Sequence, residues 1–431
     1  MASRSNQPSS TGLAVKLLAA PTKMRNTPFV LREAAANYER AIQGNLMQVA
    51  IKGRDGKHVF MPDDRNVVEF VNCSYLGLDL HPRVIEASKS AADDWGMNFC
   101  CARSRFSIEP QRLLEEELSE LYKGRVITFP STTTTHISVM PLLASGALID
   151  ENKTHKTCLI FDQFAHSSMQ YLKPVLAVEA TVETIPHNSL EDLSLHVRRA
   201  RERGEVPIYV ADGIYSMGGL CPVREVMALA EELDFYLYVD DAHGTAIFGE
   251  RGEGLVLSQI EGDIPDRLIL TFALSKGFGA YGGGLLVPGK WREGLIRSYG
   301  QVYAFSAALN FSAVYACRAV VELHHDGTVQ HLQQTLRDRV ALFDELIGKP
   351  LPFSPIRMML IGDEQNAIEA GEQMMAEGYF VSVVFFPIVR RGAAQLRVCI
   401  AANHTPDDIR GLVAALKRAQ ATYAVPKSLG A

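Results

Sequence analysis

The stretch TFALSKGFGAYGGG, residues 271–284, joins the end of an apolar segment to a single lysine and a run of glycines. Residues 268–272 are typical of a buried β-strand, and Lys276 follows where that strand should end. The glycines allow the backbone to come close to another group. Taken alone, Lys276 is most simply a solvated loop charge, so its role has to be decided by the rest of the chain.

Short apolar segments of this kind alternate with amphipathic helical patterns through the middle of the chain. The expected strands are residues 125–129, 157–162, 207–212, 235–241 and 268–272. Helical spacing predicts helices at residues 81–96, 111–124 and 223–233, with Glu115 to Glu117 on a solvated face. This alternation is typical of βαβ units in a mostly parallel α/β sheet that is covered on both faces. In such sheets, ligands bind beyond the carboxyl ends of the strands.

The pattern differs at the two ends of the chain. Residues 57–78 are predicted to form a β-hairpin that leads into a loop of the site. A helical stretch over residues 312–348 precedes a smaller α+β segment with strands at residues 357–362, 380–387 and 395–401. We therefore expect an N-terminal tail and arm (1–65), a large domain (66–300) and a small C-terminal domain (301–431). The first dozen residues are polar and are expected to be disordered.

Composition and charge argue against several classes of function. Of the 431 residues, 47% are hydrophobic and 21% are charged, and the formal net charge is −6. This charge gives no support to binding of nucleic acid or of an anionic membrane, because either would need a basic face. No apolar run reaches the roughly 18 residues of a membrane span, and the N-terminus lacks the features of a signal peptide.

Seven cysteines are scattered along the chain without a CxxC pair. Their odd number and low density indicate reduced thiols, and hence a cytoplasmic location, rather than a disulfide framework or a zinc site. The adjacent residues Cys100 and Cys101 would point to opposite sides of a strand. Neither a disulfide nor a metal pair is therefore expected there, and no metal is predicted.

Polar residues follow several of the expected strands. Asp240, Asp241 and His243 come at the end of the apolar run of the strand expected at residues 235–241, and a carboxylate placed there is suited to keeping a heteroaromatic ring nitrogen protonated. The alternative is a helix N-cap aspartate beside a surface histidine. His166 follows another strand, where it could equally be a partly buried histidine with satisfied hydrogen bonds. Asp212 and Ser216 follow a third strand.

The segment STTTTH, residues 131–136, opens a helix directly after the strand at residues 125–129. Hydroxyls and backbone N–H groups at a helix N-terminus form an anion site that suits a phosphate. Four threonines are an unusual start for a helix, because β-branched residues have low helix propensity. The alternative is a run that only caps the helix.

Taken together, these residues occur in a fixed order along successive strands: phosphate site, histidine, serine, aspartate–histidine pair and lysine. An aromatic aldehyde with a phosphate and a pyridinium nitrogen matches this set, namely pyridoxal 5′-phosphate (PLP). The aspartate would keep the ring nitrogen protonated and so maintain the electron sink. Lys276 would form the Schiff base and, once displaced, transfer protons.

At this point the sequence resembles a known family, the α-oxoamine synthases among the fold-type I PLP enzymes. This family includes 8-amino-7-oxononanoate synthase, 2-amino-3-ketobutyrate CoA ligase, 5-aminolevulinate synthase and serine palmitoyltransferase. The resemblance covers roughly residues 65 to 420, and the C-terminal segment is most similar to quorum-sensing autoinducer synthases. It rests on the motifs NCSYLGLDLHP (72–82), ADGIYSMGG (211–219), DDAHGTAIFGERGEG (240–254), SKGFGAYGGG (275–284) and QLRVCIAANHT (395–405).

The resemblance implies an aspartate aminotransferase-like fold, in which a large domain with a mostly parallel seven-stranded sheet carries a smaller α+β C-terminal domain. Carried over position by position, it gives Lys276 the Schiff base and Asp240 the pyridinium nitrogen. His243 would hydrogen-bond the ring oxygen, His166 would stack on the ring, and Ser216 would lie near the ring oxygen.

The phosphate would be held at Ser131, Thr132 and Thr133. Arg397 matches the family's arginine for the substrate carboxylate, which suits a bidentate guanidinium, although a solvated strand-edge charge is the alternative. Asn72 and Ser74, in the YLGL motif, are further candidates for substrate binding.

The chain also departs from the family pattern. Ala273 stands where the family has a hydroxyl for the phosphate, and Thr271 or Ser275 would have to compensate. His136 replaces a common asparagine, and Gln111 stands where the family has a histidine. Because such positions line the cofactor and substrate edges in the family, these departures bear on substrate preference.

The reaction that the resemblance implies is a decarboxylative condensation of an amino acid with an acyl thioester. The acyl carrier would be CoA or an acyl carrier protein, the products would be an α-aminoketone and CO2, and the active site would be shared in a homodimer. Transamination or aldol cleavage on the same scaffold is an alternative. A non-catalytic scaffold subunit is another, although its expected mark, loss of the lysine, is not met. The sequence specifies neither the amino acid, the acyl chain, the carrier nor the pathway.

Overall fold

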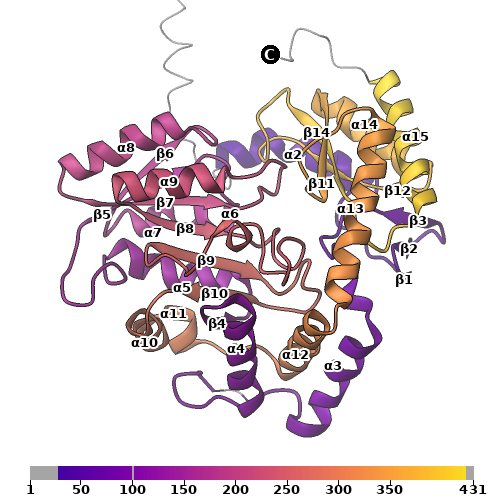
Figure 1. Cartoon of the computed structure of the whole chain (residues 1–431). Helices are drawn as coiled ribbons and strands as arrows, with labels where there is room; N and C mark the ends of the chain where they lie inside the picture. Colours follow the sequence, from indigo (N-terminus) through magenta and orange to yellow (C-terminus); the bar gives the residue numbers. More distant parts are fainter. Residues whose placement is uncertain (1–27, 100, 424–431) are drawn as a thin grey trace, which may run out of the picture.

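The computed structural model describes residues 28–99 and 101–423, so the polar first dozen residues and Cys100 lie outside the described residues. Its centre is a seven-stranded sheet with the strand order β4-β10-β9-β8-β7-β5-β6 (Figure 1). The strands are β4 (Arg125–Phe129), β5 (Thr157–Asp162), β6 (Thr181–Ile185), β7 (Val206–Asp212), β8 (Tyr236–Asp240), β9 (Leu268–Ala273) and β10 (Gly283–Val287). Strand β10 runs antiparallel to both of its neighbours, β4 and β9, and all other adjacent pairs of this sheet are parallel. The predicted mostly parallel sheet is thus confirmed.

Successive side chains of the central strands enter two different cores. On β5, Cys158 and Ile160 belong to the core on one face of the sheet. Leu159 and Phe161 belong to the core on the other face. Because both faces are covered, every residue of this strand is buried, which explains its unbroken apolar sequence.

Helices cover both faces of this sheet. They are α5 (Thr132–Ala144), α8 (Leu190–Glu202), α9 (Val223–Leu233), α10 (Lys290–Tyr299) and α11 (Gln301–Phe305), with the short α6 (Ser167–Gln170) and α7 (Lys173–Leu176). Val139 and Met140 of α5 lie in the same core as Phe161, whereas Val226 and Ala230 of α9 lie in the opposite core. Helix α5 therefore runs along one face of the sheet, and its first residue lies just beyond the carboxyl end of β4.

The glycine run explains where the strand β10 lies. A Cβ atom on Gly284 would come within 2.1 Å of the ring of Phe272 on β9. A Cβ atom on Gly283 would lie 2.4 Å from the backbone nitrogen of Thr132 at the start of α5. The close backbone approach expected from the sequence is therefore real at these two positions.

The strands of the two smaller sheets lie to one side of the large sheet (Figure 1). The strands are β1 (Gly53–Asp55), β2 (His58–Phe60), β3 (Asn66–Glu69), β11 (Ile356–Gly362), β12 (Tyr379–Phe380), β13 (Ser382–Val384) and β14 (Ala394–Cys399). The helices that complete the chain are α2 (Pro28–Gln43), α3 (Pro82–Trp95), α4 (Glu109–Tyr122), α12 (Phe311–His325), α13 (Thr328–Ile347), α14 (Glu364–Ala376) and α15 (Pro406–Thr422).

The C-terminal part has its own antiparallel sheet, in the order β11-β14-β13, which confirms the smaller α+β region. The predicted hairpin is formed by β2 and β3, but β12 pairs with β3 in parallel. The N-terminal arm and the C-terminal part thus share a sheet, and the domain boundaries at residues 65 and 300 stay a prediction. The helical stretch predicted at residues 312–348 is divided into α12 and α13 at Gly327, which has a φ of +88°.

One prediction about α4 is wrong. Glu116 is exposed, as expected, but the Glu115 side chain is buried. Its carboxylate accepts hydrogen bonds from the backbone nitrogen of Thr128 at 2.7 Å, from Arg103 at 2.8 Å and from Arg297 at 2.9 Å. Because two guanidinium groups and a backbone N–H surround it, this charge can be buried.

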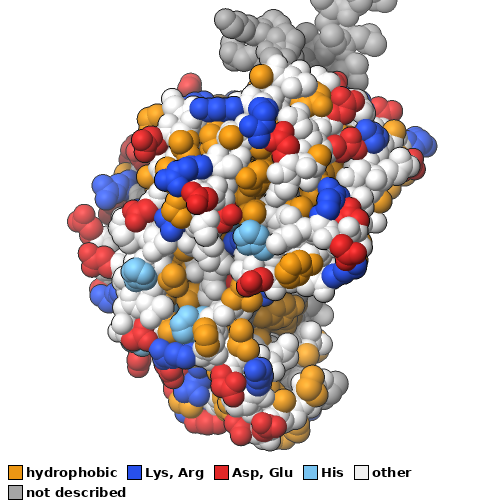
Figure 2. All heavy atoms as spheres, turned by 90° about the vertical axis from the view of Figure 1, so that its right-hand side faces the viewer, with side chains coloured by type: hydrophobic (Ala, Val, Ile, Leu, Met, Phe, Trp, Pro, Cys, Tyr) orange, Lys and Arg blue, Asp and Glu red, His pale blue; other side chains and the backbone are white. Residues whose placement is uncertain are grey.

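Over the described residues, no helix is long and apolar enough to cross a membrane. On the face seen in Figure 2, basic and acidic side chains are interspersed rather than gathered by sign.

Candidate active site

The carboxyl ends of neighbouring strands bring the predicted polar residues together. Asp240 ends β8, and in the strand register it lies opposite Asp212 of β7 on one side and Thr271 of β9 on the other. Lys276 follows β9 after a turn, and His243 follows β8. The site therefore forms at the edge of the sheet where parallel α/β sheets bind ligands.

Lys276 is half-buried and hydrogen-bonded, so it is not a solvated loop charge. Its Nζ lies 2.9 Å from Nε2 of His243, whose Nδ1 lies 2.7 Å from the hydroxyl of Tyr75. Burial, followed by the charge of Lys276, lowers the pKa of His243 well below its usual value, so the ring is neutral. When Lys276 donates to Nε2, the neutral ring carries its proton on Nδ1 and donates it to Tyr75.

Asp240 is buried but stays ionised. Its Oδ1 accepts from the backbone nitrogen of Ala242 at 3.0 Å, and its Oδ2 lies 3.1 Å from Nε2 of His136. Burial alone would raise the pKa of Asp240, but the hydrogen bond and charge of His136, with Lys276 and His166, lower it to about 2. Since His243 is also buried, the alternative of an N-cap aspartate beside a surface histidine is wrong.

Asp212 is the opposite case. Burial, followed by the charge of Asp240, raises the pKa of Asp212 well above its usual value. Its Oδ1 accepts the backbone N–H of His166 at 2.9 Å, which fixes the start of the segment that carries this histidine. The ring of His166 is half-buried, and its Nδ1 lies 2.7 Å from the hydroxyl of Ser168. Its predicted stacking role stays a prediction.

The N-terminus of α5 combines a cap with an anion site. Ser131 is the N-cap and forms a capping box with Thr134, so capping accounts for part of the hydroxyl run. The backbone nitrogens of Thr134 and Thr135 bond to Ser131, but those of Thr132 and Thr133 have no acceptor within the helix. Gly283 lies against this turn without a side chain. These two N–H groups are therefore placed to receive an anion.

Ala273 stands where the family has a hydroxyl that binds the phosphate, and its replacement by the hydroxyl of Thr271 or Ser275 stays a prediction. Ala273 is buried in β9. Thr271 is also completely buried, and its Oγ1 donates to the carbonyl of Val239 at 3.5 Å. Ser275 is exposed in the turn before Lys276. The hydroxyl of Thr271 lies against the neighbouring strand and that of Ser275 lies at the surface, so either as a phosphate ligand stays a prediction.

Arg397 is not a solvated strand-edge charge, because only 8% of it is exposed. From β14, its Nε donates to the carbonyl oxygen of Ser216 at 2.7 Å, and its Nη2 donates to Sγ of Cys73 at 3.7 Å. The guanidinium thus joins the loop after β7 to the loop after β3. After burial and the charge of Lys276, the charge of Arg397 also contributes to the lowered pKa of His243.

The loop after β3 is held by a buried ion pair that the sequence did not reveal. Lys57 lies 2.9 Å from Glu69 and donates to Oδ1 of Asn72 at 2.8 Å. The same oxygen accepts the backbone N–H of Ser74 at 2.9 Å, and Nδ2 of Asn72 donates to Glu69. The amide of Asn72 therefore shapes the loop, and substrate contacts of Asn72 and Ser74 stay predictions.

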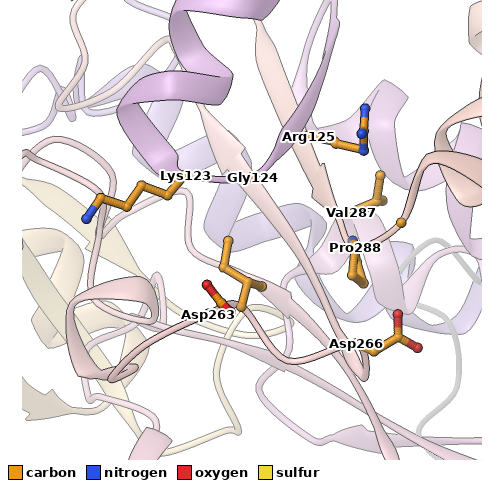
Figure 3. A pocket seen from close by; sticks show the side chains of 9 residues that line it. Lys123, Gly124, Arg125, Asp263, Asp266, Val287 and Pro288 are labelled. Atoms are coloured by element: carbon orange, nitrogen blue, oxygen red, sulfur yellow. The ribbon is translucent and has the colours of Figure 1, made fainter.

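A hollow of about 350 Å³ lies away from this site (Figure 3). It is lined by residues where β4 begins and β10 ends, which is the opposite edge of the sheet. The lining residues are Lys123, Gly124, Arg125, Asp263, Ile264, Asp266, Val287, Pro288 and Gly289. Asp266 is paired with the buried Arg292. None of the predicted site residues lines this hollow.

Comparisons with known proteins agree with this arrangement. The family model for aminotransferases of class I and II matches residues 82–416. A putative 8-amino-7-oxononanoate synthase of Desulforudis audaxviator is 30% identical over 365 residues, or 82% of this chain and 90% of that protein. The 8-amino-7-oxononanoate synthase of Dechloromonas aromatica has the same identity and coverage. That of Arabidopsis thaliana is 27% identical over 90% of this chain and 80% of its own.

Solved structures show the same fold. A serine palmitoyltransferase from Sphingomonas wittichii matches with a TM-score of 0.79 and 21% identity, covering 92% of this chain and 98% of that chain. A serine palmitoyltransferase solved with its PLP internal aldimine has a TM-score of 0.80 and 21% identity, covering 92% of this chain and 100% of that chain. The 8-amino-7-oxononanoate synthase of Francisella tularensis has a TM-score of 0.66 and 19% identity, with 83% and 99% coverage. The predicted fold-type I architecture is thereby confirmed.

Proposed function

The chain belongs to the aminotransferase class I and II family, in its α-oxoamine synthase branch, and from this premise we propose that it condenses an amino acid with an acyl thioester, with loss of CO2, using PLP. One observation carries the proposal. A half-buried lysine lies 2.9 Å from a buried neutral histidine, at the same sheet edge as an aspartate whose pKa is about 2.

The residues present fit PLP. Asp240 offers a buried, ionised carboxylate for a protonated ring nitrogen, and the N–H groups of Thr132 and Thr133 suit its phosphate. Gly283 supports the fit, because a Cβ atom there would fill the space against the first turn of α5. Lys276 would bind the aldehyde. When bound, PLP supplies an electron sink that stabilises negative charge at the Cα atom of the amino acid.

Lys276 would also move the Cα proton once its amine is free. The neutral ring of His243 accepts a hydrogen bond from Nζ, which fixes the position of the amine without adding a charge beside it. Tyr75 in turn fixes the orientation of that ring. The burial of His243 and Tyr75 keeps water from competing for these hydrogen bonds.

Arg397 would bind the carboxylate of the amino acid. A guanidinium can offer two parallel N–H groups to a carboxylate, which orients the substrate as well as binding it. Its hydrogen bond to Ser216 fixes the plane of the guanidinium. A positive charge at this place raises the affinity for an amino acid over that for a simple amine.

The proposal extends to the second substrate, the oligomeric state and the location of the protein. The names of the relatives support an acyl thioester as second substrate, with the amino acid and acyl chain left open. Exposed apolar side chains at Met97, Phe99, Phe106 and Phe305 support a subunit interface, and we propose a homodimer with a shared site. Among the described residues, six cysteines are free thiols, which supports a cytoplasmic location.

The experiment compares wild-type protein with Lys276→Ala, and uses Lys290→Ala as the control because Lys290 is an exposed lysine outside the site. Each protein is reconstituted with PLP, and its visible spectrum is recorded. Amino acids carrying a labelled carboxyl group are then screened with acyl-CoAs, and released CO2 and free thiol are measured.

We expect a visible cofactor band that Lys276→Ala lacks, and equal amounts of CO2 and thiol that appear only when both substrates are present. A keto acid formed without a thioester would instead establish transamination. Absence of any cofactor band from the wild-type protein would overturn the PLP assignment altogether.

A further inference from the structure

Asp240 is held by a hydrogen-bonded chain of side chains that reaches across two elements. Nε2 of His136, on α5, lies 3.1 Å from Oδ2 of Asp240. Nδ1 of His136 lies 2.9 Å from the hydroxyl of Tyr238, which shares β8 with Asp240. The rings of His136 and Tyr238 meet edge to face, with centroids 5.7 Å apart. Both side chains are completely inaccessible to solvent.

The register of β8 explains why a single histidine can contact both residues. Tyr238 and Asp240 are two residues apart, so their side chains leave the strand on the same face. His136 approaches that face from α5, and one imidazole spans the gap between a phenol and a carboxylate. A shorter side chain, such as asparagine, would reach only one of them.

The direction of the hydrogen bond between His136 and Asp240 follows from the charge of Asp240. Asp240 is ionised and can only accept, so Nε2 of His136 carries the proton. The hydroxyl of Tyr238 is the partner of Nδ1, and it can either donate to this nitrogen or accept from it. Burial, followed by the charge of Asp240, raises the pKa of Tyr238 well above its usual value, so that hydroxyl keeps its proton. The side-chain polar atoms of His136, Tyr238 and Asp240 therefore all have hydrogen-bond partners in this network.

The helix that carries His136 also carries the anion site. Thr132 and Thr133 offer their N–H groups in the first turn of α5, and His136 follows one turn later. Four residues of helix rise by about 6 Å, so the two features have a fixed separation. PLP carries its phosphate on a side arm and its nitrogen in the ring, and both groups would be located by the same helix.

We propose that His136, supported by Tyr238, is a positioning residue that orients Asp240 and keeps it ionised for the ring nitrogen of PLP. The inference rests on the proposed function, because it assigns the partner of Asp240 in that same site. His136 would act through Asp240 and would not touch the substrate. A buried histidine with a purely structural role would affect folding but not the protonation of Asp240.

The test uses His136→Asn, His136→Gln and Tyr238→Phe. The control is Ser138→Ala, which alters a buried hydroxyl on the same helix that accepts the backbone N–H of Tyr303. The dissociation constant of PLP is measured by fluorescence titration of the apoprotein at several pH values between 5.5 and 8.5. The thermal stability of each apoprotein is measured in parallel.

We expect His136→Asn to weaken PLP binding by about 10- to 100-fold, which corresponds to loss of one hydrogen bond to a charged group. The loss should grow as the pH falls, because the pKa of Asp240 is no longer held low. Tyr238→Phe should weaken binding less, and His136→Gln should recover part of the loss. Ser138→Ala should follow the wild-type pH profile.

Variants of His136 with wild-type affinity for PLP at every pH, whatever their stability, would overturn the inference. If a variant of His136 fails to fold, Tyr238→Phe decides the matter, because it removes one hydroxyl and keeps the ring. Failure of the proposed function would look different: the wild-type protein itself would lack a cofactor band that depends on Lys276.

Discussion

Removal of Lys57 should be among the most destabilising single changes outside the cofactor site. Only 2% of its side chain and 3% of that of Glu69 are exposed, and their charged atoms are 2.9 Å apart. Lys57→Met keeps most of the side-chain volume but leaves the carboxylate of Glu69 buried without a counter-charge. Breaking a buried ion pair in this way costs about 3–5 kcal/mol.

The structure offers a matched control. Lys52 pairs with Asp64 at 2.5 Å, also across twelve residues, but their side chains are 52% and 86% exposed. An exposed pair of this kind contributes about 0–1 kcal/mol, because water screens the charges. Lys52→Met therefore removes the same ammonium group from a pair of similar geometry, and the two variants differ mainly in burial.

Equilibrium unfolding in urea, followed by circular dichroism, measures the difference. We expect the midpoint of Lys57→Met to fall well below that of Lys52→Met without a change in slope. Adding Glu69→Gln to Lys57→Met should recover part of the loss, because the uncompensated charge is removed. Equal midpoints for Lys57→Met and Lys52→Met would refute the argument that burial makes this pair essential.

Three further changes test other features. The hydrogen bond to Cys399 and nearby positive charges hold the pKa of Cys73 well below its usual value, so iodoacetamide should label Cys73 as fast at pH 7 as at pH 9. The labelling rate is read by mass spectrometry, and a tenfold fall in this rate per pH unit would contradict the prediction. Burial raises the pKa of Asp241 to about 8, above its value in the unfolded chain, so the contribution of Asp241 to stability should decline between about pH 4 and pH 8. Asp241→Asn should therefore flatten this part of the plot of urea midpoint against pH, and an unchanged plot would count against the prediction. Gly283→Ala should displace the first turn of α5 and weaken PLP binding at least tenfold. The control Gly294→Ala, where the added Cβ atom would meet open space, should bind PLP with the wild-type affinity. Equal affinities of the two variants for PLP would rule out the proposed phosphate site.

The sequence predicted the central strands well because burial on both faces leaves them continuously apolar. The strands β5 and β4 have the predicted bounds. The strand β6 was missed because it lies at the edge of the sheet and is mostly half-buried, so its sequence TVETI mixes polar and apolar residues. The strand β10 was missed because its glycines indicate a loop, whereas the structure uses them to make room for Phe272 and the start of α5.

Most of the predicted site residues lie at or just after the end of a strand whose apolar run is visible in the sequence, whereas Thr271 and Arg397 lie within strands. Their partners could not be found in this way. His136 is 104 residues from Asp240, and Tyr75 is 168 residues from His243. Such pairs depend on the register and packing of separate elements, which local patterns do not specify. The only sign in the sequence of the role proposed for His136 was that it stands where the family commonly has an asparagine.

The two aspartates at the ends of β7 and β8 show how the fold can give neighbouring carboxyl groups different charges. Asp212 and Asp240 lie opposite each other on adjacent strands, and two buried negative charges at neighbouring positions would repel each other strongly. His136 and Lys276 favour the charged form of Asp240, whereas Asp212 is held mainly by the backbone N–H of His166. The negative charge is therefore favoured on Asp240 and disfavoured on Asp212. A cofactor nitrogen that needs an anion would find it at Asp240, while Asp212 fixes the segment of His166 through its backbone N–H.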